Sequence, residues 1–391
     1  MLTPQETAEM IAGLQQLYEQ IEDDLLTNVA RRFSVADNIT PETVTEWQVE
    51  KLNQIGALRK ENIRVLAAQS GKTEKEITRI LEAAGYKAVA FDDQIYQLAF
   101  SRGLLATVPQ PARLSPMLQT ALQGAVDNTR KYFNLINTTA LESAQQSFIT
   151  VVNQTYLETS LGITDYTTAV RKAVTQLADQ GISGAHYVSA AGKQTWNHID
   201  VAVRRCIVTS TAQTAGVMQE ARAKEWGANL VEVSSHMGAR PSHAAWQGKV
   251  YSLDGGTLEY PNLRASTGYG TVTGLCGANC KHYFSPYFEG ISEQTYKPYD
   301  LAENKKAYDE SQKQRQLERD VRAQKRRVLA ADASGDAEGL KAAQLKLKEK
   351  EAKLKAFTQQ TGRYQRTNRQ QVYGFDRSQA SRAAWTKRKS Q

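Results

Sequence analysis

Apolar side chains recur every three to four residues along the first hundred positions of the chain, which is the period of an amphipathic helix. The first stripe consists of Ile11, Leu14, Tyr18, Ile21, Leu25 and Val29. It follows the capping-box sequence at residues 3–6, and similar start signals at 40–41 and 73–76 predict two further helices. We therefore expect a helical N-terminal module over residues 1–105.

A change of period marks the middle of the chain. The segment 104–117 contains three prolines and reads as a linker, after which helices are predicted at 117–160, 164–178 and 196–226. Residues 229–235 and 249–253 are instead short, rich in β-branched residues and partly alternating, which is typical of strands. Residues 117–290 are therefore predicted to form a central α+β domain.

The C-terminal part of the chain reads as two charged helices, 302–331 and 337–360, followed by a tail. The second helix carries a strict seven-residue repeat of Leu340, Leu347 and Leu354. Such a repeat suits an antiparallel helical hairpin over residues 300–361, with a basic tail over 362–391. The expected fold class is mainly α, with a small α+β central domain between the N-terminal helical module and this hairpin.

Positive charge is concentrated at one end of the 391 residues. The net charge is +8, yet residues 301–391 hold 23 lysines and arginines against 11 acidic residues, an excess of 12, so the remainder carries −4. A local excess of this size favours a polyanion such as nucleic acid. A solvated basic helix face gives the same count, and both interpretations stay open.

The tail mixes basic and aromatic residues in a way that suits phosphate contacts with base stacking. The candidate DNA-binding residues are Arg363, Arg366, Arg369, Arg377, Arg382, Lys387, Arg388 and Lys389. A tail that folds onto another subunit, or one that is simply solvated, is equally consistent with this composition.

Several classes of protein are disfavoured. No run of about 18 apolar residues occurs, and the N-terminus lacks a basic patch followed by an apolar segment, so we expect no membrane association and no secretion signal. Three cysteines do not make a disulfide framework, which favours synthesis in a reducing compartment.

Scarce metal-ligating residues gather in one stretch of the central domain. The chain has five histidines and three cysteines, and Cys276, Cys280 and His282 fall within seven residues. With His243 as the fourth ligand and His236 in reserve, they supply the four nitrogen and sulfur donors of a tetrahedral structural zinc site. The alternative is a packed cluster of reduced cysteines and hydrogen-bonded histidines.

Catalysis by the same region is an alternative hypothesis. His236 or His243 could act as a general base while Arg240 and Lys249 clamp a phosphate, as in a nuclease. The sequence shows no paired carboxylates, glycine-flanked serine or nucleotide-binding loop, so we predict no catalytic residues and no enzyme activity.

The chain resembles the tailed-phage minor capsid protein 2 family, which is related to the Mu F-like head-morphogenesis proteins. The specific matches are Arg240-Pro-Ser-His-Ala244 and Asn279-Cys-Lys-His282. Supporting matches lie at residues 17–24, 30–32, 47–53, 70–74, 246–251, 274–278 and 316–319. In the Mu F-like relatives a cysteine pair and a His-Pro-Asn-Cys-Arg-Cys element occupy this region. His243, Cys276 and His282 stand near those positions here, giving a mixed set of two histidines and two cysteines.

The resemblance implies a structural virion protein, assembled in the host cytoplasm and associated with the portal vertex or the head interior. Its implied partners are the portal protein, the major capsid protein and packaged double-stranded DNA, with homo-oligomerisation left open. Roles in head morphogenesis or DNA ejection follow from the same resemblance. The alternative function is a phage-encoded nuclease or toxin delivered with the genome.

Overall fold

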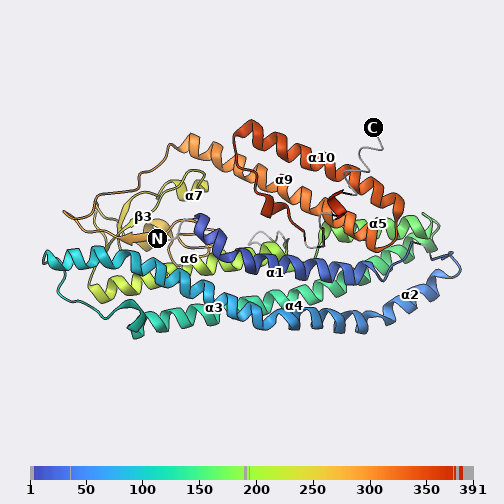
Figure 1. The fold of residues 1–391 in the computed structure, drawn as a ribbon, viewed down its shortest axis with the longest axis horizontal. Helices are drawn as coiled ribbons and strands as arrows, with labels where there is room; N and C mark the ends of the chain where they lie inside the picture. The colour runs from blue at the N-terminus through green and yellow to red at the C-terminus, as the bar shows by residue number, and fades with distance from the viewer. Residues whose placement is uncertain are drawn as a thin grey trace. The chain divides into compact units, whose positions relative to one another are not determined.

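Helices dominate the part of the chain that the structure describes, and the strands in it form two small sheets (Figure 1). The computed structural model describes residues 4–381 apart from 36, 189–191, 193, 373, 376 and 377. This architecture confirms the predicted fold class of a mainly α protein with a small α+β part.

The α-helices are α1 (Pro4–Ala30), α2 (Val44–Asn53), α3 (Ile55–Ser101), α4 (Pro116–Ser160), α5 (Tyr166–Gln180), α6 (Ile199–Trp226), α7 (Pro241–Ala244), α8 (Leu263–Thr267), α9 (Leu301–Ala333) and α10 (Ala337–Thr361). Helices α1, α4, α5, α6, α9 and α10 lie close to predicted positions, whereas the short helices α7 and α8 were not predicted. Short 3-10 turns lie at Ala112–Leu114 and Thr367–Gln370.

Both sheets are antiparallel. The strands are β1 (Ser183–Val188), β2 (Gln194–His198), β3 (Leu230–Val233), β4 (Val250–Ser252) and β5 (Phe284–Pro286). Strands β1 and β2 pair with each other, while β3 lies between β4 and β5. The β3 and β4 strands were expected. The β1–β2 pair was not: it lies between the predicted helices 164–178 and 196–226 and includes the first three residues of the second one.

The chain forms two compact units, each assembled from three segments. Unit 1 draws on residues 1–14, 72–133 and 204–311, and unit 2 on the segments between and after them. Helices α1, α3, α4, α6 and α9 contribute residues to both units. The domain boundaries predicted from the sequence follow chain order, because a hydrophobic pattern reports helix faces and not which distant segments pack together.

The helix start expected at Thr73 is wrong. Helix α3 runs without interruption from Ile55 to Ser101, and Thr73 is buried inside it. Gly71 lies in the same helix, where a glycine is unfavourable relative to alanine by about 1 kcal/mol but does not force a break. Packing of the apolar face of the helix outweighs the local start signal.

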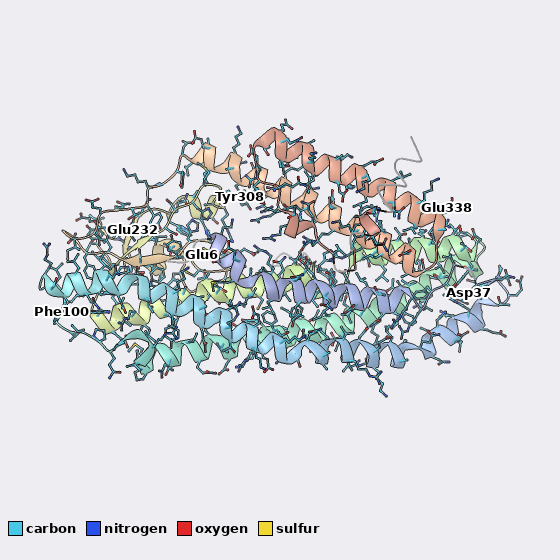
Figure 2. The ribbon with its side chains drawn as sticks, in the orientation of Figure 1. Glu6, Asp37, Phe100, Glu232, Tyr308 and Glu338 are labelled. Carbon is cyan, nitrogen blue, oxygen red and sulfur yellow. The ribbon has the colours of Figure 1, made fainter. Side chains whose placement is uncertain are left out.

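The predicted C-terminal hairpin is confirmed, with helix ends within two residues of expectation at α9 and α10. Its core consists of Val321, Val328, Ala343, Leu347 and Leu354, with Leu317 and Leu340 packed against it. Asp336 caps α10 by accepting a hydrogen bond from the backbone N–H of Gly339 at 2.9 Å. Figure 2 shows Glu338 beside this turn, at the start of α10.

The aromatic residues of the three-stranded sheet in unit 1 are packed in its core. Trp246, Tyr251 and Tyr269 belong to one buried cluster with Phe284 of β5 and with Ala223 of α6. The rings of Tyr269 and Phe284 meet edge to face at 5.2 Å between centroids. This cluster holds the sheet against α6 and forms the floor of the histidine and cysteine site.

Candidate metal centre

The predicted ligands lie on two connections of the three-stranded sheet in unit 1. His243 is on α7, between β3 and β4, and the cysteines and His282 are on the loop that leads into β5. This loop turns tightly: Cys276 and Asn279 have φ angles of 58° and 57°. At Gly274 a Cβ atom would lie 2.0 Å from the carbonyl oxygen of Gly268, so only glycine fits there.

Three of the predicted ligand atoms converge. The Nδ1 atoms of His243 and His282 are 3.4 Å apart, and the Sγ atom of Cys280 lies 3.7 Å from the first and 3.6 Å from the second. The three residues are 2–3% exposed. Three of the four ligands predicted from the sequence therefore lie together in the fold.

The outer nitrogens of both imidazoles have hydrogen-bond acceptors. His243 Nε2 lies 2.8 Å from the carbonyl oxygen of Thr273, and His282 Nε2 lies 3.0 Å from Oε1 of Gln247. The same Oε1 atom accepts a hydrogen bond from the backbone N–H of His236 at 3.0 Å. Both rings are thus held in fixed orientations, with Nδ1 turned toward Cys280.

Burial sets the ionisation of this group. It lowers the pKa of His243 to about 4 and that of His282 to about 2, with smaller contributions from neighbouring positive charge. Burial also raises the pKa of the Cys280 thiol. In the absence of a bound cation, the two imidazoles are therefore neutral at neutral pH and the thiol keeps its proton.

The other two predicted ligands occupy different positions. Cys276 is buried, and its thiol lies 3.8 Å from the carbonyl oxygen of His282, outside the group of three converging ligand atoms. The His236 ring stacks on His282 with 4.4 Å between centroids, and its Nδ1 atom faces the carbonyl oxygen of Met237 at 3.2 Å.

The residues of the nuclease hypothesis are engaged elsewhere. Arg240 donates a hydrogen bond to the carbonyl oxygen of Ala278, and Lys249 Nζ donates to the carbonyl oxygen of Ala245 at 2.9 Å. These contacts tie α7 to its neighbouring turns. Both cations therefore have a structural role that needs no bound phosphate.

The tail arginines that the structure describes bind the hairpin. Arg366 makes two hydrogen bonds of 2.8 Å to the carboxylate of Glu318, and Arg363 donates to Oε1 of Gln314 at 2.9 Å. Arg369 is half-buried, and desolvation lowers its pKa to about 10. The other candidates, Arg377, Arg382, Lys387, Arg388 and Lys389, lie outside the described residues.

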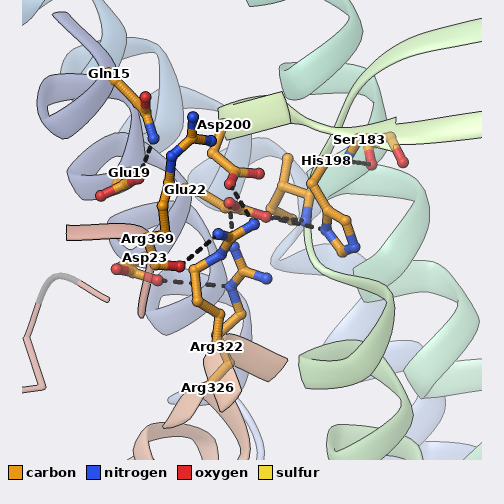
Figure 3. Close-up of polar contacts among 12 residues, drawn as sticks. Gln15, Glu19, Glu22, Asp23, Ser183, His198, Asp200, Arg322, Arg326 and Arg369 are labelled. Atoms are coloured by element: carbon orange, nitrogen blue, oxygen red, sulfur yellow. Dashed lines mark hydrogen bonds and ion pairs between the residues drawn. The ribbon is translucent and has the colours of Figure 1, made fainter. Parts of the chain in front are cut away.

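A buried network of charges in unit 2 was not predicted from the sequence (Figure 3). Glu22 of α1 is fully buried and pairs with Arg326 of α9 and, at 3.3 Å, with His198. Asp200 of α6 pairs with Arg322 at 2.9 Å. The sequence does contain one signal for this network: Glu22 lies four positions after Tyr18, on the apolar face of the predicted first helix.

Fold and site together define a helix-rich protein with a small α+β part built around a buried histidine and cysteine cluster. The model of the phage minor capsid protein 2 family matches residues 2–359. The chain therefore belongs to this family and is a phage structural protein, which confirms the resemblance.

Two phage proteins, each named a structural protein, are similar to the chain. One, from Lactococcus phage LL-H, is 26% identical over 309 residues, which cover 76% of this chain and 81% of that protein. The other, from Lactococcus phage mv4, is 41% identical over 78 residues, or 20% of this chain and 63% of that protein. No solved structure matches the chain. Among the described residues, no helix is both long and apolar enough to cross a bilayer.

Proposed function

We propose that the protein is a minor component of the phage head, next to the portal vertex on the inner side of the shell, where it binds packaged double-stranded DNA. The excess of 12 positive charges over residues 301–391 is the observation that carries this proposal. A position inside the head would place this positive charge next to packaged DNA, which is the dominant polyanion there.

The hairpin provides a surface for such contacts. The apolar stripe of α10 packs on α9, and Lys350 of α10 pairs with Asp320 of α9 at 3.6 Å. Four lysines of α10 are exposed: Lys341, Lys346, Lys353 and Lys355. Lysines on a helix contact phosphates without reading bases, which suits a protein that must accept any packaged sequence.

Two of the candidate tail arginines form contacts within the protein. Arg363 and Arg366 are engaged with α9, and they fasten the chain after α10 to the hairpin. The proposed contacts are therefore the exposed lysines of α10 together with the basic positions after residue 376. Docking to the portal or major capsid protein, and self-association, are the protein–protein part of this proposal.

The burial of the two histidines in unit 1 disfavours the nuclease alternative. His243 and His282 are each 2% exposed, so a nucleic-acid backbone has no access to them. The nuclease or toxin alternative predicts that purified protein degrades DNA and that His243→Ala abolishes this activity. We expect intact DNA after incubation with both proteins.

The test is duplex binding measured by fluorescence anisotropy over a range of salt concentrations. Replacing Lys341, Lys346, Lys353 and Lys355 by glutamine should weaken binding and reduce the slope of log K against log salt by about 0.9 for each lost phosphate contact. The matched control replaces four exposed lysines of α3 and α4, Lys60, Lys72, Lys75 and Lys131. Equal binding by both variants and the wild type would refute the role of α10.

A further inference from the structure

We propose that His243, Cys280 and His282 bind one zinc ion in unit 1, through the two Nδ1 atoms and Sγ. The inference concerns the structure of the protein and is independent of the proposed contact with DNA. It follows from the distances between the ligand atoms, from the hydrogen bonds of the outer nitrogens, and from the kind of donors present.

The distances match the edges of a zinc tetrahedron. With Zn–N bonds of about 2.0–2.1 Å and a Zn–S bond of about 2.3 Å, tetrahedral angles separate two nitrogens by about 3.3–3.4 Å and nitrogen from sulfur by about 3.6 Å. The corresponding distances here are 3.4 Å between nitrogens and 3.7 and 3.6 Å to sulfur. One ion can therefore bind all three atoms without a change of backbone.

Because the outer nitrogen, Nε2, of each imidazole donates a hydrogen bond, the inner nitrogen, Nδ1, carries no proton and has a free lone pair. The carbonyl oxygen of Thr273 can only accept, so His243 carries its proton on Nε2. Oε1 of Gln247 accepts the backbone N–H of His236, which identifies it as the amide oxygen. His282 must therefore also donate from Nε2, and its Nδ1 is an acceptor.

Without a bound cation, the available protons cannot satisfy both Nδ1 acceptors. Two lone pairs face each other at 3.4 Å between His243 and His282, and the Cys280 thiol has one proton to donate. At most one Nδ1 atom gains a donor in this way, while the other remains a buried acceptor next to a second acceptor. A cation between the three atoms bonds to all of them and replaces the thiol proton.

The donor set selects the ion. Two imidazoles and a thiolate suit zinc and related transition metals, whereas calcium and magnesium require oxygen ligands. Hydrogen bonds from the outer nitrogens to Thr273 and Gln247 are the supporting contacts that ligating histidines normally have. These three residues leave the fourth position of the tetrahedron open to a further ligand such as water. The ion ties α7 to the loop before β5 and so has a structural role.

The first experiment measures zinc by elemental analysis in the full chain, purified without chelators or metal-affinity resin. We expect about one zinc per chain. His243→Ala and Cys280→Ser should lose the ion and melt at a lower temperature. Cys206→Ser, which removes a thiol from α6, is the matched control and should keep the ion.

A second measurement does not depend on the folding of variants. Cobalt(II) is titrated into chelator-treated wild-type protein whose far-ultraviolet circular dichroism shows retained helix. A tetrahedral thiolate site gives intense visible absorption and a sulfur-to-cobalt charge-transfer band that saturate at one equivalent. Failure to bind either zinc or cobalt in this folded protein would overturn the assignment, as would unchanged zinc content in Cys280→Ser.

Discussion

The orientation of the two facing imidazoles depends on uncharged acceptors. Gln247 is completely buried and fixes both the ring of His282 and the backbone of His236. Replacing it by leucine keeps a side chain of similar size but removes the acceptor, so His282 is no longer held with Nδ1 inward. We expect Gln247→Leu to weaken zinc binding roughly 10–100-fold, as measured by competition with a chromophoric chelator.

Cys276 can be compared with the proposed ligand Cys280. It is as buried as Cys280, yet its thiol lies outside the converging group. Cys276→Ser should therefore keep its zinc with an affinity close to that of the wild type. Loss of the ion in this variant would show that Cys276 supplies the fourth ligand and that water does not.

Glu19 gives unit 2 a dependence on pH. Burial raises its pKa from 4.5 to about 7. A carboxyl group with a raised native pKa stabilises the fold fully below the unfolded value, and this contribution is lost as the pH rises through 7. The loss between pH 5 and pH 8 amounts to roughly 2–3 kcal/mol.

Glu19→Gln should remove this loss, because the amide stays neutral at both pH values. Urea unfolding at pH 5 and pH 8 should show a smaller difference in free energy of unfolding for the variant than for the wild type. Glu46→Gln, on the exposed face of α2, is the matched control and should behave as the wild type. An unchanged pH difference in Glu19→Gln would contradict the protonated state inferred for Glu19.

At the scale of elements, much of the helical architecture could be predicted from the period of apolar residues, and the hairpin most accurately. The seven-residue repeat of Leu347 and Leu354 specified one narrow face, and both side chains are completely buried. The continuity of α3 could not be predicted in this way, since a local capping signal at Thr73 does not report the packing around it. The β1–β2 pair was missed because its sequence has no strong alternation.

The candidate site was partly predictable for a related reason. Scarcity and spacing identified His243, Cys280 and His282. They could not exclude Cys276, because the direction of its side chain depends on a positive φ angle that the sequence does not specify. The carboxylate of Glu22 in α1 was missed because its partners, Arg326 of α9 and His198 of β2, lie far away along the chain.

The hairpin core makes a direct prediction. Leu347→Ala removes a buried side chain from the α9–α10 interface and should cost about 2–5 kcal/mol of stability. The neighbouring Lys346 is exposed, so Lys346→Ala should change the free energy of unfolding by less than about 0.5 kcal/mol. Similar losses in both variants would contradict the assigned face of α10.

The ionic network predicts a comparable asymmetry along α9. Arg326→Met leaves Glu22 buried without its guanidinium partner, which typically costs 3–5 kcal/mol. Arg319→Met alters an exposed arginine of the same helix and should be nearly neutral. The comparison is made by thermal unfolding of both variants, and a neutral Arg326→Met would show that Glu22 does not depend on this ion pair.

At the scale of the whole molecule, the two compact units contain different buried clusters. Unit 1 contains the site assigned to zinc, and unit 2 contains the buried charge network and the hairpin core. The exposed lysines of α10 belong to unit 2. The proposed contact with DNA is therefore made by residues separate from the proposed metal ligands, and each can be tested without disturbing the other.

The most direct measurement of the functional proposal is photochemical cross-linking of protein to packaged DNA in intact phage particles, followed by mass spectrometry of the adducts. We predict nucleotide adducts on peptides of this protein that cover α10 and the basic residues after it, with few on α2 and α3. Adducts confined to other parts of the chain would contradict the role of the hairpin. A protein present in the particles but free of DNA adducts would contradict its proposed contact with packaged DNA.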